Sequence, residues 1–167
     1  MKRYLKYLIL FCVLFCSAIV SFGQSTCATS TLVGALPYNL FTTTCGAGDN
    51  YNQNDACGSN YMRGDDYVFE YTPNTAQALQ IDLTGTDYKT GVFIMDGCPD
   101  APGTSCIDFE TEYWGNPSML TPTLTAGTTY YIVVSTNPAG SIGEQCTDFI
   151  IDIQCIGPTC PPTVQDC

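Results

Sequence analysis

Short stretches of alternating apolar and polar residues constrain the fold of this chain more than any other feature. Segment 78–85, ALQIDLTG, places aliphatic residues on one side and polar residues on the other, and segments 66–71 and 147–155 repeat the pattern. A side-chain period of two is typical of half-buried antiparallel strands. The residues predicted to face inward are Leu79, Ile81, Leu83, Tyr67, Phe69, Tyr71, Phe149, Ile151 and Ile153.

Two further segments are apolar over most of their length. Residues 91–97, GVFIMDG, and 128–136, TTYYIVVST, predict central strands that are covered on both faces. Turn-forming pairs such as Gly-Thr, Asn-Pro and Asp-Gly separate the segments at intervals of about ten residues. We therefore predict an all-β fold, an antiparallel two-sheet sandwich with about eight strands, held by disulfide bonds.

The start of the chain differs from the rest. Three basic residues precede an apolar stretch, 7–20, and small residues follow it before Gln24. This pattern is typical of a cleaved secretory signal peptide and is too short for a stable membrane span. We predict a signal peptide over 1–23, a sandwich over 24–156, and a protein that is secreted or held at the cell surface.

Removal of the signal peptide leaves Arg63 and Lys89 as the basic residues against sixteen acidic ones, a net charge of −14 (2 − 16). Such a surface repels phosphate and anionic lipid, which predicts no nucleic-acid partner and no membrane association after cleavage. About 144 residues remain, enough for one domain with a substantial core.

Nine of the eleven cysteines follow the signal peptide. In an exported protein they predict disulfides, and the absence of histidine and of Cys-x-x-Cys pairs argues against zinc. The expected disulfide residues are Cys27, Cys45, Cys57, Cys98, Cys106, Cys146 and Cys155. The sequence leaves the pairing open; the turn-rich segments between neighbouring cysteines suggest Cys98–Cys106 and Cys45–Cys57, with Cys27 joined to Cys146 or Cys155.

The last eleven residues, 157–167, are rich in proline and lack any alternation. Together with the odd number of cysteines, they predict a linker or the start of a further domain in a longer chain.

Five segments follow one another in a recognisable order: ALPYNLFTTTCGAGDNYN, ACGSNYMRGDDYVFEYTP, GVFIMDGCPDAPGTSCI, NPSMLTPTLTAGTTYYIVVST and CTDFIIDIQC. Over 27–155 the chain resembles the cysteine-rich form of the pre-peptidase C-terminal domain. This β-sandwich occurs in secreted and surface proteins of gliding bacteria that use type IX secretion. The resemblance implies a non-catalytic accessory or adhesion module of jelly-roll type with further domains beside it. We expect an extracellular ligand, with a glycan or a surface protein as the candidates, and the sequence does not identify it.

Segment 61–73, YMRGDDYVFEYTP, contains an Arg-Gly-Asp tripeptide. An adhesive tripeptide needs an exposed hairpin tip, whereas this one stands directly before a predicted strand. We interpret Gly64 as a turn residue, and we expect Asp65 or Asp66 to accept backbone N–H groups from the preceding loop.

The same acidic pair contributes to a calcium hypothesis. Segment 48–55, GDNYNQND, offers hard oxygen ligands close in sequence to the pair, although the spacing does not match an EF-hand. Ordinary Asn/Asp turns explain the same residues. Calcium is thus the one cofactor considered, and its candidate ligands are Asp49, Asn52, Asp55, Asp65 and Asp66.

A carbohydrate-binding module is the alternative function. Aromatic rings in loops can stack on sugar C–H surfaces while polar groups fix orientation. The segment EYWGNP, with Tyr113, Trp114 and Asn116, is the best candidate, unless Trp114 packs over a sheet edge instead. The aromatic residues in or near predicted loops are Tyr51, Tyr61, Tyr88, Tyr113 and Trp114.

A secreted hydrolase is a third, weaker interpretation. Asp108, Glu110 and Glu112 alternate along a predicted strand and so share a face, as a pair of glycosidase carboxylates would. A solvated strand face explains them equally. Because the chain lacks histidine and a Gly-x-Ser-x-Gly motif, we predict no catalytic residues and no enzymatic activity.

Overall fold

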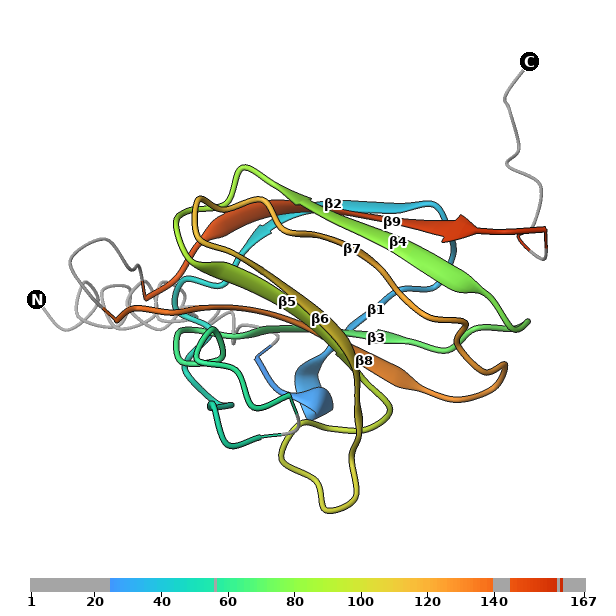
Figure 1. The fold of residues 1–167 in the computed structure, drawn as a ribbon, viewed down its shortest axis with the longest axis horizontal. Helices are drawn as coiled ribbons and strands as arrows, with labels where there is room; N and C mark the ends of the chain where they lie inside the picture. The colour runs from blue at the N-terminus through green and yellow to red at the C-terminus, as the bar shows by residue number, and fades with distance from the viewer. Residues whose placement is uncertain (1–24, 56, 140–144, 159, 161–167) are drawn as a thin grey trace, which may run out of the picture.

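The computed structural model describes residues 25–55, 57–139, 145–158 and 160. Two β-sheets pack face to face (Figure 1), which confirms the predicted all-β sandwich. The described elements are a 3-10 helix, Cys27–Thr29, and the strands β1 Thr31–Leu32, β2 Tyr38–Thr43, β3 Tyr67–Tyr71, β4 Ala78–Thr84, β5 Thr90–Met95, β6 Cys106–Glu112, β7 Ser118–Leu120, β8 Tyr130–Thr136 and β9 Asp148–Ile156.

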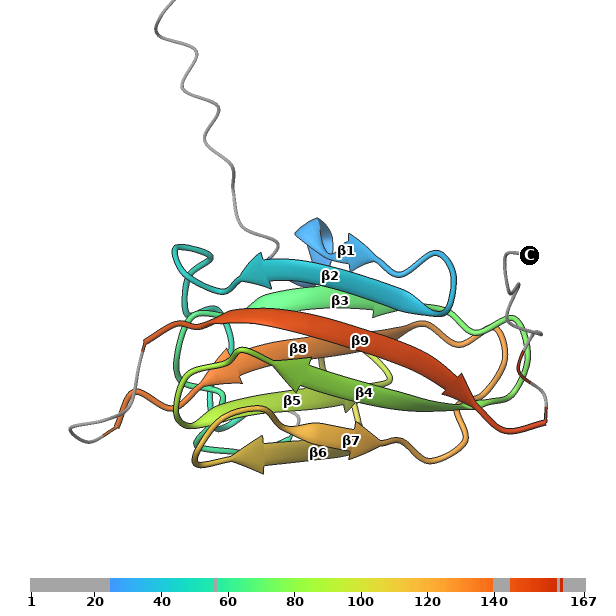
Figure 2. The ribbon, with the colours of Figure 1, turned by 90° about the horizontal axis from the view of Figure 1, so that it is seen from above.

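The chain changes sheets at most of its connections. The five-stranded sheet has the order β1-β3-β8-β5-β6 and the four-stranded sheet the order β2-β9-β4-β7. All neighbours are antiparallel except β1 and β3. As a result, β2, β4, β6 and β8 all run toward the same end of the sandwich (Figure 2), and the connections that follow them meet there.

The main core lies between the two sheets and includes every residue predicted to face inward. Phe69, Ile81 and Ile151 are fully buried there. The alternation works because each strand has one face toward the opposing sheet and the other toward solvent or a covering loop.

A second, smaller core covers the outer face of the five-stranded sheet. The β2–β3 connection, residues 44–66, crosses this face (Figure 1) and packs Tyr51 and Met62 against Val68, Phe93 and Val133 of the strands. This layer explains why every residue of β5 is buried. The prediction that 91–97 and 128–136 form strands covered on both faces is therefore confirmed.

Four disulfides staple the described chain: Cys27–Cys98, Cys45–Cys146, Cys57–Cys106 and Cys155–Cys160. All seven cysteines predicted to be oxidised are bonded, but each suggested pairing was wrong. The loop that contains Cys98 and ends at Cys106 is closed by hydrogen bonds instead: Asp96 N donates to Ser105 O (3.2 Å), and Ser105 N donates to Asp96 Oδ1 (2.7 Å).

The true pairings follow strand neighbourhood. Cys45 and Cys146 lie two residues beyond the last paired positions of β2 and β9, Thr43 and Asp148, and so continue the same register. Cys57–Cys106 anchors the β2–β3 connection to the edge strand β6.

Some predictions concern residues outside the described ranges. The signal peptide, 1–23, and most of the linker, 157–167, belong to this group. Of the linker, Cys160 is described and is bonded to Cys155. In the part of the chain that the structure describes, no helix has the length and apolar character needed to cross a membrane.

Candidate functional site

Three aromatic residues gather at the end of the sandwich where the connections after β2, β4, β6 and β8 meet. Tyr88 lies on the β4–β5 connection, and Tyr113 and Trp114 lie on the β6–β7 connection. The Trp114 ring is 4.9 Å from Tyr113 and 5.4 Å from Tyr88 between centroids, edge to face in both cases. We call Tyr88, Tyr113 and Trp114 the aromatic cluster.

The aromatic cluster faces solvent. Trp114 is 69 % exposed, and Tyr88 and Tyr113 are 42 % and 43 % exposed. The alternative in which Trp114 packs over a sheet edge is therefore wrong. Edge-to-face contacts with two neighbouring rings restrict the orientation of the indole, and its exposure leaves most of the ring available for contact.

Hydrogen bonds join the two loops of the cluster. The Asn116 Oδ1 accepts from Thr86 N (3.1 Å) and Thr86 Oγ1 (3.4 Å), and Asn116 N donates to Thr86 Oγ1. Lys89 N donates to Tyr113 O (3.0 Å). Asn116, predicted as a ligand contact, thus uses its side-chain oxygen to hold the β4–β5 loop against the β6–β7 loop.

The backbone at this junction is tightly constrained. Gly115 has φ 86°, and a Cβ there would lie 2.7 Å from Asp87 O and 2.8 Å from Thr86 O. Lys89 and Asn116, the non-glycine residues of positive φ in the described chain, both have φ 59°. Such backbone conformations cost energy and persist where the surroundings enforce them, often at binding sites.

Lys89 connects a third loop to the cluster. Its Nζ lies 5.6 Å from the centroid of the Tyr113 ring, within range of a cation–π interaction, and donates a hydrogen bond to Ala139 O. Asn137 N also donates to Lys89 O (2.9 Å). The β8–β9 connection is thereby tied to the aromatic loops.

The Arg-Gly-Asp segment has the structural role predicted from the sequence. Arg63 N donates to Thr136 O (3.1 Å) and Asp65 N donates to Gln145 O (2.7 Å). The tripeptide is thus bonded to the end of β8 and to the β8–β9 connection, and it is not a hairpin tip. A Cβ on Gly64 would overlap Thr136 Oγ1 and Gln145 O. This close backbone approach requires glycine.

Both aspartates accept backbone N–H groups from the preceding loop, as predicted. Asp65 Oδ2 accepts from Gly46 N (2.9 Å), and Asp66 Oδ2 accepts from Asn50 N and Tyr51 N (2.8 Å each). Asp66 is fully buried, and its Oδ1 has no hydrogen-bond partner among the described residues. Burial raises the pKa of Asp66 to about 7.

The remaining candidate calcium ligands form turns. Asn52 Oδ1 accepts from Asn54 N (2.9 Å), and Asp55 Oδ2 accepts from Asn52 N (2.6 Å). Asp49 is exposed, but its pKa is raised. The larger cause is partial loss of solvent around the carboxylate, and the smaller cause is the negative charge of nearby Asp65. In the described ranges, no three or more acidic or cysteine side chains converge on a point that could hold a metal. Calcium binding by these residues stays a prediction.

The carboxylates proposed for a hydrolase share one face of β6, as predicted. Asp108, Glu110 and Glu112 pair with Ile94, Val92 and Thr90 of β5. Strand β6 is the edge of the five-stranded sheet. Charged side chains on an edge strand prevent pairing with another sheet, which explains this acidic row without catalysis.

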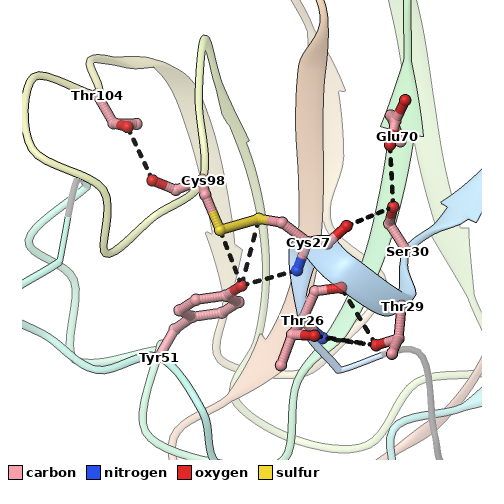
Figure 3. Close-up of a disulfide and its surroundings, with 8 residues drawn as sticks. All are labelled: Thr26, Cys27, Thr29, Ser30, Tyr51, Glu70, Cys98 and Thr104. Carbon is pink, nitrogen blue, oxygen red and sulfur yellow. Dashed lines mark hydrogen bonds between the residues drawn. A yellow bond between two sulfur atoms is a disulfide. The ribbon is translucent and has the colours of Figure 1, made fainter.

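Tyr51, predicted from the sequence as an aromatic residue in or near a loop, is buried and holds Cys27 and Cys98 through its hydroxyl. It is 2 % exposed, and its hydroxyl accepts from Cys27 N (3.0 Å) and lies 3.3 and 3.2 Å from the sulfurs of Cys27 and Cys98 (Figure 3). Burial raises the pKa of Tyr51 to about 12, so the hydroxyl stays protonated. Tyr61 is half-buried beside the same core.

Sequence reasoning missed Thr86 and Lys89, which hold the aromatic cluster together. Both lie in a short polar segment between predicted strands, and their contacts are with residues 24 to 50 positions away. No local pattern marks such residues; the signal would have been the pairing of β4 with β7 and of β5 with β6.

Comparison with models of known families and with curated proteins found no match. Among solved structures, the chain is similar to a periplasmic inhibitor of g-type lysozyme, PliG of Aeromonas hydrophila, at 13 % identity over 76 % of this chain and 96 % of that one, with a TM-score of 0.47. A β-(1,4)-mannanase of Podospora anserina, GH26-CBM35, matches at 19 % identity over 59 % of this chain and 21 % of that one, with a TM-score of 0.33. Neither likeness assigns a function to this chain.

Proposed function

We propose that this protein is a non-catalytic extracellular binding module, an accessory or adhesion domain whose ligand contacts the aromatic cluster. The observation that carries the proposal is the exposure of Trp114, 69 %, in an orientation fixed by two tyrosines. Four disulfides support a place outside the cell, because such bonds persist in oxidising compartments.

A carbohydrate is the ligand that this surface suits best. The exposed rings of Trp114 and the flanking tyrosines can stack on sugar C–H groups. The exposed carboxylates of Asp87 and Glu112 adjoin Tyr88 and Tyr113 in the chain and can accept hydrogen bonds from sugar hydroxyls. A surface protein, the other ligand considered, would use the same rings as interface anchors.

The order of motifs over 27–155 supports assignment to the cysteine-rich pre-peptidase C-terminal type. On this assignment, export by the type IX route and further domains in a longer chain belong to the proposal. The module would supply attachment, and any catalysis would belong to a neighbouring domain.

A glycan array tests the proposal. We expect the protein to bind a defined set of glycans and the variant Trp114→Ala to lose at least about tenfold in affinity, about 1.4 kcal/mol. Phe41→Ala is the matched control, because Phe41 is also 69 % exposed but lies on the four-stranded sheet. Absence of glycan binding would exclude the carbohydrate ligand, and equal losses in both variants would exclude the site.

A further inference from the structure

A pocket of about 400 Å³ opens at the end of the sandwich opposite the aromatic cluster. The pocket is lined by Gly34 and Leu36 of the β1–β2 connection, by Asn74 and Gln77 of the β3–β4 connection and by Tyr71 of β3. The two connections lie at the same end of the sandwich (Figure 2). This volume lies within the range of sites for small ligands, about 300–1,000 Å³.

The floor of the pocket is polar and ordered. Gln77 Nε2 donates a hydrogen bond to the hydroxyl of Tyr71, and Thr75 Oγ1 donates to Gln77 Oε1 (3.4 Å). Tyr71 and Gln77 are 6 % and 5 % exposed. Because both ends of the Gln77 amide are engaged, its orientation is fixed, as in a preformed site.

Other polar groups of the pocket are unused by the protein. Asn74 is exposed, and its side-chain amide forms no hydrogen bond within the described residues. The main-chain groups of Gly34 and Ala35 also lack partners in the described chain. The pocket therefore offers amide donors and acceptors to a ligand.

None of the residues that line the pocket is charged. A phosphate, carboxylate or ammonium group would lose its hydration there without a counter-charge, which is costly. A wholly apolar ligand would leave the amide and hydroxyl groups unpaired. A neutral ligand with many hydroxyl groups meets both conditions.

We propose that this pocket is a second binding site, which takes a single neutral sugar unit. The Asn74 amide donates to and accepts from sugar hydroxyls, and Leu36 covers the C–H side of the ring. The site is independent of the aromatic cluster, which lies at the other end of the strands (Figure 2).

Titration of the ¹⁵N-labelled protein with glucose, galactose, mannose and N-acetylglucosamine, followed by NMR, tests this site. With sugar up to about 50 mM, well above a millimolar Kd, we expect saturable shifts confined to amides of residues 34–36 and 71–77 for at least one sugar. Absence of saturable shifts would overturn the proposal. So would shifts confined to the aromatic cluster, which would favour the proposed function alone.

Two variants make the test specific. Asn74→Ala should weaken the binding at least about fivefold, and Gly34→Phe should abolish it by filling the pocket. A Cβ at Gly34 meets no atom within 4 Å, so the second variant should fold. Trp114→Ala should bind the sugar like the wild type. Unchanged affinity in both pocket variants, or loss only in Trp114→Ala, would contradict the second site.

Discussion

The β2–β3 connection and the loops of the aromatic cluster both carry aromatic residues among polar turn residues, yet they present them in opposite ways. Tyr51 of the connection is 2 % exposed and lies under a disulfide, whereas Trp114 is 69 % exposed. The β2–β3 connection packs on the apolar outer face of the five-stranded sheet. The β6–β7 loop instead lies beyond the ends of its strands. Position relative to the sheets, rather than residue type, therefore separates an aromatic that stabilises the fold from one that can bind a ligand.

The largest effect predicted from this comparison is on stability. Tyr51→Ala removes a ring from the second core and its hydroxyl from Cys27 N, and should lower the free energy of unfolding by about 4 kcal/mol. Denaturant titration measures the change. A decrease of less than about 1 kcal/mol in the free energy of unfolding would show that the packing of the β2–β3 connection does not depend on Tyr51.

Asp66, which bonds the same connection, should make stability depend on pH. Its pKa is raised from 3.8 to about 7, so the folded state holds the proton more tightly than the unfolded chain. The stabilisation from this proton is full below about pH 4, is lost as the pH rises through 7, and is about 4 kcal/mol. Between pH 4 and pH 8, the free energy of unfolding of the wild type should fall. The fall should be smaller in Asp66→Asn. Equal slopes in the two proteins would contradict the assignment; Asp49, with a raised pKa, accounts for a residual slope.

Gly64→Ala probes how closely the connection approaches β8. The added methyl group overlaps Gln145 O, a backbone atom, and should cost about 2 kcal/mol of stability. Gly34→Ala is the control, since a Cβ there meets nothing within 4 Å, and should change stability by less than about 1 kcal/mol. Equal melting temperatures for the two variants would remove the claim that glycine is required at 64.

Trp114→Ala should have the smallest effect on folding. Because the ring is mostly exposed, we expect the free energy of unfolding to change by no more than about 0.5 kcal/mol. Thermal unfolding beside Tyr51→Ala makes the comparison direct. A destabilisation as large as that of Tyr51→Ala would place Trp114 among the structural residues.

Much of the fold could be predicted from the sequence because period-two alternation reports which strand face is buried. The inward residues of β3, β4 and β9 and the doubly covered strands β5 and β8 follow from that pattern. The backbone bonds accepted by Asp65 and Asp66 also followed, since Asp before a strand favours such contacts.

The disulfide pairing and the aromatic cluster could not be predicted in the same way. Cys45 meets Cys146 only because β2 and β9 are neighbours, which no local pattern specifies. Likewise, Tyr51 and Trp114 both stand among turn residues, and their different burial arises from packing between distant segments.

The affinity of Trp114→Ala for a glycan that the wild type binds, measured by titration calorimetry, tests the central claim most directly. We predict a loss of at least about tenfold in affinity, with a melting temperature equal to that of the wild type and full affinity retained in Phe41→Ala. Unchanged affinity in Trp114→Ala would contradict the claim that the exposed aromatic cluster is the binding surface.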